Sequence, residues 1–459
     1  MGMNRRAFLA GGGLAAVGLP AAALTDLQAD KTCSVDVCVA GGGPAGFIAA
    51  IAAARNGAKT VLVEQYGFPG GMATAGLVGP ISKFNCGGRR VVGGIPAEFI
   101  ERLRRDGGAI TDLPSGNIPF DAECYKRVAR EMLEEAGVKS LWQSSVSQPE
   151  FGPDGSMKAC RLVTAGFISR LEAKCFIDCT GSGALVGNGG SLGRWRSPIE
   201  KAQPLSLCFI LGGVDTSKRQ LLMAEDGVKY ADQTLRGHLS AAVAKGRLKA
   251  FGGPWALWGS TIRPGFVSVN CTRASGNLTD PEDAARATTA LRRDIPHVID
   301  VFRRSDPVFK DAFLVQTAVA TGFRESRELV ALHRMTADEI LSGADLPDAI
   351  ALGAHPMDRH CPGGNAQVVT FLKRPYPIAL RSLISRTCPN LLAAGGLVAA
   401  EPDAFASMRV QAQCMAMGQA AGTAAAWMLE RKVPVQRIDG VAVRAVLERQ
   451  GALTRPDNA

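Results

Sequence analysis

The sequence has few aromatic residues and no closely paired cysteines. Aromatic residues make up 6% of the 459 positions and the basic residues are scattered, which argues against a nucleic-acid groove, where a basic stripe is interleaved with aromatic side chains. None of the twelve cysteines forms a C-x-x-C pair, and the closest two, Cys175 and Cys179, fall on an expected buried strand. We therefore expect no metal site and no thioredoxin-type site.

Long apolar runs are also missing beyond the N-terminal segment. No later stretch reaches about 18 uninterrupted apolar residues, so we expect no stable membrane span in the mature protein. Hydrophobic residues nevertheless make up 46% of the chain and charged residues 20%, which is typical of a globular protein with a large core. A length of 459 residues favours two domains, and a net charge of +10 is compatible with an anionic small substrate.

The first 29 residues have the pattern of an export signal. Arg5 and Arg6 precede Phe8 and Leu9, an uncharged stretch follows, and Ala21-Ala22-Ala23 offers a small-residue cleavage site. This resembles a twin-arginine signal peptide and predicts a periplasmic protein that meets the twin-arginine export machinery. A retained membrane anchor is the alternative. That route carries folded proteins, so a cofactor would be bound before export.

A dinucleotide-binding fingerprint begins at Gly41. Val35 to Ala40 is an expected buried strand, and it leads into Gly41, Gly43 and Gly46 in a G-x-G-x-x-G pattern. Pro44 suits the first turn of a helix expected from Ala45 to Arg55, and a second strand is expected from Thr60 to Val63. Glu64 follows that strand, where an acidic side chain accepts hydrogen bonds from a ribose.

Three distant segments are expected to complete the same domain. The doublet Gly70-Gly71, followed by Met72, lies where the backbone would pass close to a cofactor. The stretch from Lys174 to Gly183 is expected to be a strand that ends in Thr180-Gly181, and a strand beginning at Asn390 leads to Gly395. A long helix then runs to Trp427, with small residues such as Gly418 and Gly422 that would pack closely on a sheet. Its N-terminus could hold the pyrimidine oxygen of a flavin.

These segments together resemble the FAD-dependent oxidoreductases, and more distantly the fumarate reductase and succinate dehydrogenase flavoproteins. The resemblance covers nearly everything from Val35 to Trp427. It rests on the motifs at 41–46, 70–74, 93–98, 203–204, 322–327, 356–360, 375–378 and 409–422. The chain departs from the family at Ser182, where the family usually has aspartate, and at Gly396, where arginine is frequent.

The resemblance implies FAD, and we expect it to be noncovalent because no histidine lies near Gly70. The expected fold is α/β, with a Rossmann-like FAD-binding domain (30–193 and 382–430) interrupted by an α+β substrate or cap domain (194–381) and followed by a tail (431–459). The expected FAD contacts are Gly41, Gly43, Pro44, Ala45, Gly46, Glu64, Gly70, Gly71, Met72, Thr180, Gly181, Gly395, Asp403, Arg409 and Val410.

The segment "HPMDRH" offers a base for flavin chemistry. His355 and His360 bracket Asp358, and dehydrogenation at a flavin needs a group that removes a substrate proton while hydride moves to N5. The alternative interpretation is a pair of surface histidines in a loop. Arg324 is a candidate substrate or flavin contact, or else half of a helical surface pair with Glu328.

The predicted function is hydride transfer between a small organic substrate and FAD. Arg409, just before the late helix, could anchor an anionic group beside the flavin. Only one intact nucleotide fingerprint is present, so a quinone, a cytochrome or a small acceptor is expected as the electron partner rather than bound NAD(P)H. The alternatives are a flavin oxidase or monooxygenase that uses oxygen, and a noncatalytic FAD-binding accessory protein.

Overall fold

The computed structural model describes residues 32–110, 116–187, 191–217, 229–257, 261–362 and 366–456. The signal peptide predicted for residues 1–29 lies outside these ranges. Among the helices within them, none is both long enough and apolar enough to cross a bilayer.

The main sheet has seven strands in the order β5-β2-β1-β8-β7-β6, with β19 also paired to β8. The parallel strands are β1 (Thr32–Ala40), β2 (Thr60–Val63), β5 (Lys139–Leu141), β8 (Phe167–Asp178) and β19 (Leu391–Ala393). Strands β6 (Ser144–Phe151) and β7 (Met157–Thr164) form an antiparallel extension. The register aligns Ala40 with Val63 and Asp178, and Asp178 with Ala393. The loops that follow all four residues therefore meet at one edge of the sheet.

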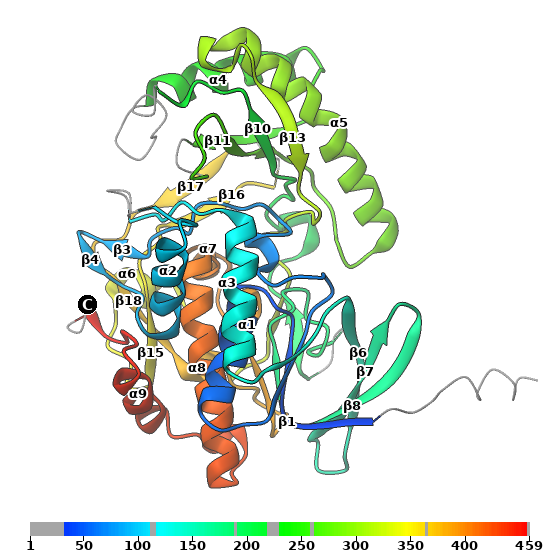
Figure 1. Cartoon of the computed structure of the whole chain (residues 1–459), viewed down its shortest axis with the longest axis vertical. Helices are drawn as coiled ribbons and strands as arrows, with labels where there is room; N and C mark the ends of the chain where they lie inside the picture. Colours follow the sequence, from blue (N-terminus) through cyan, green and yellow to red (C-terminus); the bar gives the residue numbers. More distant parts are fainter. Residues whose placement is uncertain are drawn as a thin grey trace, which may run out of the picture.

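Two helices from opposite ends of the chain pack together beside this sheet. They are α1 (Pro44–Arg55) and α8 (Gln411–Arg431) (Figure 1). A Cβ at Gly418 would overlap the carbonyl oxygen of Ala45, and one at Gly422 would overlap that of Ala49. Helix α8 contacts the sheet strands β8, β1 and β19 as predicted, and its glycines also bring it against α1, because only glycine lets the two backbones come so close.

Three further helices surround this pair: α2 (Gly94–Arg105), α3 (Ala122–Glu135) and α9 (Gly440–Arg449). Phe47 of α1, Phe99 of α2 and Tyr125 of α3 meet edge-on, with ring centroids 4.6–5.8 Å apart. All three rings are fully buried. This aromatic contact fixes the three helices in one core.

A second, antiparallel sheet builds the cap, drawn in green in Figure 1. Its order is β11 (Phe251–Leu257), β12 (Val267–Thr272), β10 (Phe209–Gly212) and β13 (Phe313–Thr317). Helices α4 (Lys229–Ala244) and α5 (Pro281–Ser305) pack on it. Its core draws on Leu77 and on buried residues from Leu205 to Ala318.

The segment after the cap sheet returns to the body that contains α1 and α8. Buried residues from Met335 to Leu380, assigned to the cap from the sequence, pack in the core of α1 and α8. This segment contains α6 (Ala337–Ser342) and the pairs β15 (Ala349–Gly353) with β18 (Tyr376–Ala379) and β16 (Met357–His360) with β17 (Gln367–Thr370).

The remaining elements are short. They are β3 (Asn85–Cys86) with β4 (Arg89–Arg90), β9 (Gly193–Trp195) with β14 (Arg327–Leu329), and α7 (Pro402–Met408). The α/β class and the Rossmann-like parallel sheet predicted from the sequence are confirmed.

Candidate functional site

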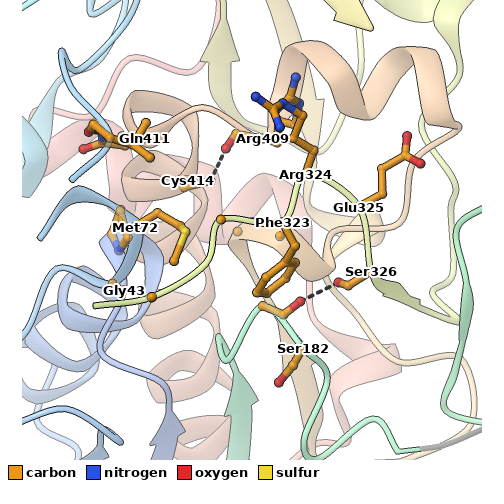
Figure 2. A pocket seen from close by; sticks show the side chains of 18 of the residues that line it. Gly43, Met72, Ser182, Phe323, Arg324, Glu325, Ser326, Arg409, Gln411 and Cys414 are labelled. Atoms are coloured by element: carbon orange, nitrogen blue, oxygen red, sulfur yellow. Dashed lines mark hydrogen bonds between the residues drawn. The ribbon is translucent and has the colours of Figure 1, made fainter. Parts of the chain in front are cut away.

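A cavity of about 1310 Å³ lies between the loops at the carboxyl edge of the main sheet and the cap. Most of the predicted cofactor residues line it: Gly41, Gly43, Pro44, Ala45, Glu64, Gly71, Met72, Thr180, Gly181, Gly395, Arg409 and Val410. Figure 2 shows Gly43 and Met72 on one side of this cavity, across from Arg324 and Arg409. The structure thus brings together segments that are up to 369 residues apart in the sequence (Gly41 to Val410).

Gly46, Gly70 and Asp403 lie outside this lining. A Cβ at Gly46 would overlap the carbonyl oxygen of Gly41, so Gly46 serves the close packing of α1 against the preceding loop. Gly70 has φ +112° and begins the tight turn that carries Gly71. Asp403 is half exposed and pairs with Arg359 at 2.8 Å.

Glu64 sits at the end of β2 with 4% of its surface exposed. Its carboxylate accepts hydrogen bonds from the amides of Gly42 at 2.6 Å and Tyr66 at 2.8 Å. Burial raises the pKa of this carboxyl, while the amide donors act in the opposite direction. Glu64 therefore shapes the glycine loop as well as facing the cavity.

Two helix N-termini also face the cavity. Gly43 caps α1 and Val410 caps α8, and neither has a side-chain cap in the described structure. Uncapped first-turn amides and the positive helix end attract phosphate and other anions. Gly43 comes close to Gly71, whose own Cβ would lie 2.9 Å from the Gly43 Cα. The glycine cradle, the two helix ends and Glu64 fit FAD.

Asp178 supports this site from behind, and no sequence motif singles it out. Its buried carboxylate accepts hydrogen bonds from the amide and hydroxyl of Thr180 at 3.0 and 2.7 Å. It also accepts from the amides of Leu185 and Val186 at 2.8 and 3.0 Å. Asp178 thereby holds the Thr180-Gly181 turn against the cavity. Ser182 and Gly396, the two departures from the family pattern, line the cavity as well.

A buried ion-pair cluster lies behind Gly396, which lines the cavity. Glu328 is fully buried and pairs with Arg196 at 2.8 Å, and also with Arg194 and Arg334. The Arg196 guanidinium in turn donates to the carbonyls of Gly396, Val398 and Ala400 at 2.7–3.0 Å. This pairing excludes the helical surface pair of Arg324 with Glu328, since Glu328 lies in β14.

The predicted base cluster faces the cavity from β16 and the turn before it. His355, Asp358 and His360 all line the cavity, and only 4% of the surface of His360 is exposed. The Nε2 of His360 lies 3.4 Å from a carboxylate oxygen of Asp358, and its Nδ1 is buried with no partner in the described structure. His355 donates from Nδ1 to the carbonyl of Pro356 at 2.7 Å. The two histidines are therefore not surface residues.

Burial and nearby charges set the protonation of this cluster. Burial, with Arg324 and Arg273 nearby, lowers the pKa of His360 to about 3. Burial likewise lowers the pKa of His355 to about 4. Burial alone would raise the pKa of Asp358, but the hydrogen bond with His360 and the charge of Arg409 bring it to about 2. At neutral pH the cluster holds neutral imidazoles and one carboxylate.

The two predicted arginines approach the cavity from different segments. Figure 2 shows Arg324 and Arg409 with their guanidinium groups pointing the same way, and Glu325 pointing away from them. Arg324 donates to the carbonyl of Pro204 and to the hydroxyl of Ser206, both at 2.6 Å. Arg409 donates to the backbone carbonyl of Asp358 at 2.9 Å. A third arginine, Arg273, lies behind Ser206 and carries no sequence motif that would have singled it out.

Comparison with known proteins gives a family match over most of the chain. The family model described as FAD dependent oxidoreductase matches residues 36–447. No curated protein matches the chain. Among solved structures, a geranylgeranyl bacteriochlorophyll reductase-like protein from Thermoplasma acidophilum is 15% identical, with a TM-score of 0.45 over 91% of this chain and 88% of that one.

Two other similar structures belong to enzymes with different activities. The flavin-dependent brominase Bmp2 is 14% identical, with a TM-score of 0.46 over 91% of this chain and 83% of its own. The anhydrotetracycline hydroxylase OxyS from Streptomyces rimosus is 13% identical, with a TM-score of 0.42 over 91% and 65%. These likenesses do not select a reaction. From the family match over residues 36–447, the chain belongs to the FAD-dependent oxidoreductases and is an enzyme that uses FAD.

Proposed function

We propose that this enzyme is a dehydrogenase or reductase that transfers hydride between a small organic substrate and the flavin N5. The observation that carries the proposal is the buried pair of His360 and Asp358 on the cavity wall, beside Arg409 and the N-terminus of α8. Such a pair supplies the proton transfer that must accompany hydride transfer from a hydroxyl or Cα–H group.

FAD, when bound, supplies the hydride acceptor or donor. The chain supplies the proton chemistry. The pair of His360 and Asp358 accepts the proton from the substrate and shares it across the 3.4 Å contact between Nε2 of His360 and the Asp358 carboxylate, while Nδ1 of His360 stays buried. The Asp358 carboxylate then stabilises the imidazolium that forms, as carboxylates do in other acid–base pairs. In the reductive direction the same imidazolium returns the proton.

Hydrogen bonds from other segments fix the strand that carries this pair. Arg409 donates to the backbone of Asp358 at 2.9 Å and fixes the strand that carries both members of the pair. The amide of His360 is held by the side chain of Gln203 at 3.0 Å, and Gln203 is held in turn by Glu325 at 2.9 Å. The pair is therefore positioned by bonds from three separate segments.

The experiment is anaerobic reduction of the FAD enzyme by a panel of small alcohols, amines and acids, followed at the flavin absorbance. We expect at least one to bleach the flavin, and His360→Asn to slow bleaching by about 10²–10⁴-fold with FAD content unchanged. Asn keeps a similar volume but cannot accept a proton. A reduced flavin that reacts with air to insert oxygen into the substrate would instead make the enzyme a monooxygenase. A flavin that no reductant bleaches would make it a noncatalytic carrier.

We further propose export by the twin-arginine route, with a quinone or cytochrome as the electron acceptor in the periplasm. Arg5 and Arg6 support the route, and the presence of a single nucleotide fingerprint supports an acceptor other than bound NAD(P)H. Replacing both arginines by lysine should leave the FAD-loaded protein in the cytoplasm. Periplasmic recovery of that double variant at the wild-type level would contradict the route.

A further inference from the structure

The hydroxyl of Ser206 accepts hydrogen bonds from two buried guanidinium groups at once. Arg324 Nη1 lies 2.6 Å from Ser206 Oγ, and Arg273 Nη1 lies 2.8 Å from it. A serine oxygen has two lone pairs, and both are used here. The hydroxyl hydrogen must then point elsewhere, and Ser206 lines the cavity. Ser206 is therefore a donor toward the cavity.

Asn270 is oriented by the same two arginines. Its Oδ1 accepts from Arg273 Nη1 at 2.9 Å and is 3.5 Å from Arg324 Nη2. Guanidinium groups only donate, so the amide oxygen must face them and the NH₂ group must face away. Asn270 also lines the cavity. We call Ser206, Asn270, Arg324 and Arg409 the donor wall.

The positive charge behind this wall has little compensation. Arg273 is 1% exposed and Arg324 is 9% exposed, and neither has a carboxylate at ion-pair distance among the described residues. Nε and Nη2 of Arg273 are buried without a hydrogen-bond partner among the described residues, and so is Nε of Arg409. Asp358 is the carboxylate that acts electrostatically on Arg273 and Arg324, and Glu325 acts with it on Arg409. Buried charge without a counter-ion is costly unless a ligand supplies it.

The chain makes room for this charge at one glycine. A Cβ at Gly252, in β11, would overlap the guanidinium of Arg273. The strand thus carries glycine where any other residue would displace the arginine. The cap sheet is therefore shaped to accommodate the buried guanidinium of Arg273.

We propose that the donor wall binds the carboxylate of an anionic organic substrate and holds its neighbouring carbon beside His360. The proposal rests on the proposed hydride transfer for the identity of the reacting carbon, but the anion site stands on its own geometry. Donors from a hydroxyl, an amide and two guanidinium groups satisfy carboxylate oxygens, which only accept. A neutral amide of the same shape would place its NH₂ group, which only donates, against the hydrogen-bond donors of the wall, and would therefore bind less well.

The test measures binding of acetate, acetamide and inorganic phosphate to the FAD enzyme by calorimetry and by the shift of the flavin absorbance. We expect acetate to bind at least tenfold more tightly than acetamide, and more tightly than phosphate. Ser206→Ala should weaken acetate binding about tenfold and leave acetamide unchanged, since the lost bond is to a charged acceptor. Ser145→Ala, which removes a hydroxyl from the same cavity in β6, is the matched control and should not change acetate binding.

Equal binding of acetate and acetamide would overturn the proposal, and so would acetate binding that is indifferent to Ser206→Ala. If phosphate bound more tightly than acetate, the donor wall would be assigned to a phosphate-bearing compound. The proposal that it binds a substrate carboxylate would then be overturned. FAD content and the unfolding temperature, checked first, confirm that each variant folds. Acetate binding does not need electron transfer. An enzyme that binds acetate as expected but whose flavin no substrate bleaches would therefore overturn the hydride-transfer function alone.

Discussion

The backbone amide of Gly42 donates a 2.6 Å hydrogen bond to the carboxylate of Glu64, which joins the glycine loop after β1 to the end of β2. One acidic side chain thus holds the glycine loop and also faces the cavity. The loop conformation and the ribose contact expected for Glu64 depend on the same carboxylate.

Glu64→Ala should therefore weaken FAD binding by removing both roles. We expect a purified variant with a lower ratio of flavin to protein absorbance and a lower unfolding temperature than the wild type. Glu64→Gln keeps one acceptor oxygen for the amides of Gly42 or Tyr66, so its loss should be smaller. Unchanged FAD occupancy in the alanine variant would refute the assignment of Glu64 to the cofactor.

Gly43→Ala separates folding from cofactor binding. An added Cβ at Gly43 meets only the Cα of Gly71, at 4.0 Å, and the φ of −65° suits alanine. The apoprotein should unfold at the wild-type temperature. The methyl group enters the cavity where a pyrophosphate approaches the backbone, so we expect at least tenfold weaker FAD binding in a titration of the apoprotein.

Gly46→Ala is the contrasting variant. Its Cβ would overlap the carbonyl oxygen of Gly41, so the helix and the loop must separate. We expect a lower unfolding temperature for the apoprotein itself. If Gly46→Ala were as stable as Gly43→Ala, the close packing at the start of α1 would not depend on glycine.

Glu328→Gln should destabilise the protein strongly. The fully buried Arg196 would lose its counter-charge, and unpairing a buried ion pair costs about 3–5 kcal/mol of unfolding free energy. Urea unfolding followed by circular dichroism measures the change. The control is Asp403→Asn at the partly exposed pair with Arg359, where a loss below about 1 kcal/mol is expected. Similar losses in both variants would contradict a special role for the buried cluster.

Stability should fall on mild acidification because of His355 and His360. Their pKa values are lowered to about 4 and about 3, below the 6.5 of an unfolded chain. Between pH 6.5 and 4 the unfolded state binds protons that the folded state does not. Each histidine should therefore remove up to about 1.4 kcal/mol per pH unit as the pH drops through that range.

Unfolding free energies at pH 7.5, 6 and 5 test this expectation. His355→Gln and His360→Gln should each flatten the fall, because glutamine takes up no proton. His238→Gln, at an exposed position of α4, should keep the wild-type dependence. A fall equally steep in all four proteins would assign the acid sensitivity to other groups.

The elements around the glycine loop could be predicted because short local sequence patterns specify them. The strand, glycine loop, helix and second strand expected at 35–40, 45–55 and 60–63 are found at 32–40, 44–55 and 60–63. Each pattern depends on neighbours within about 25 residues. The parallel register then aligns their ends, which explains why separate motifs reach one cavity.

Of the donor wall, sequence motifs single out Arg324 and Arg409, but Ser206 and Asn270 could not be predicted in the same way. Ser206, Asn270 and Arg324 come from three separate segments of the cap, and no spacing in the sequence links them. The direction in which Ser206 and Asn270 donate is set by Arg273, which shares no motif with either. The packing of α8 on α1 was hidden for a similar reason: small residues indicate close contact but do not name the partner.

That contact between the first and the last major helices has a consequence for biosynthesis. Gly418 of α8 packs against Ala45 at the start of α1, and the N-termini of both helices face the cavity. A nascent chain that has emerged only through the cap can form the fingerprint around Gly41 but lacks the α8 wall of the same cavity. We therefore expect stable cofactor uptake only after residues 411–431 have left the ribosome.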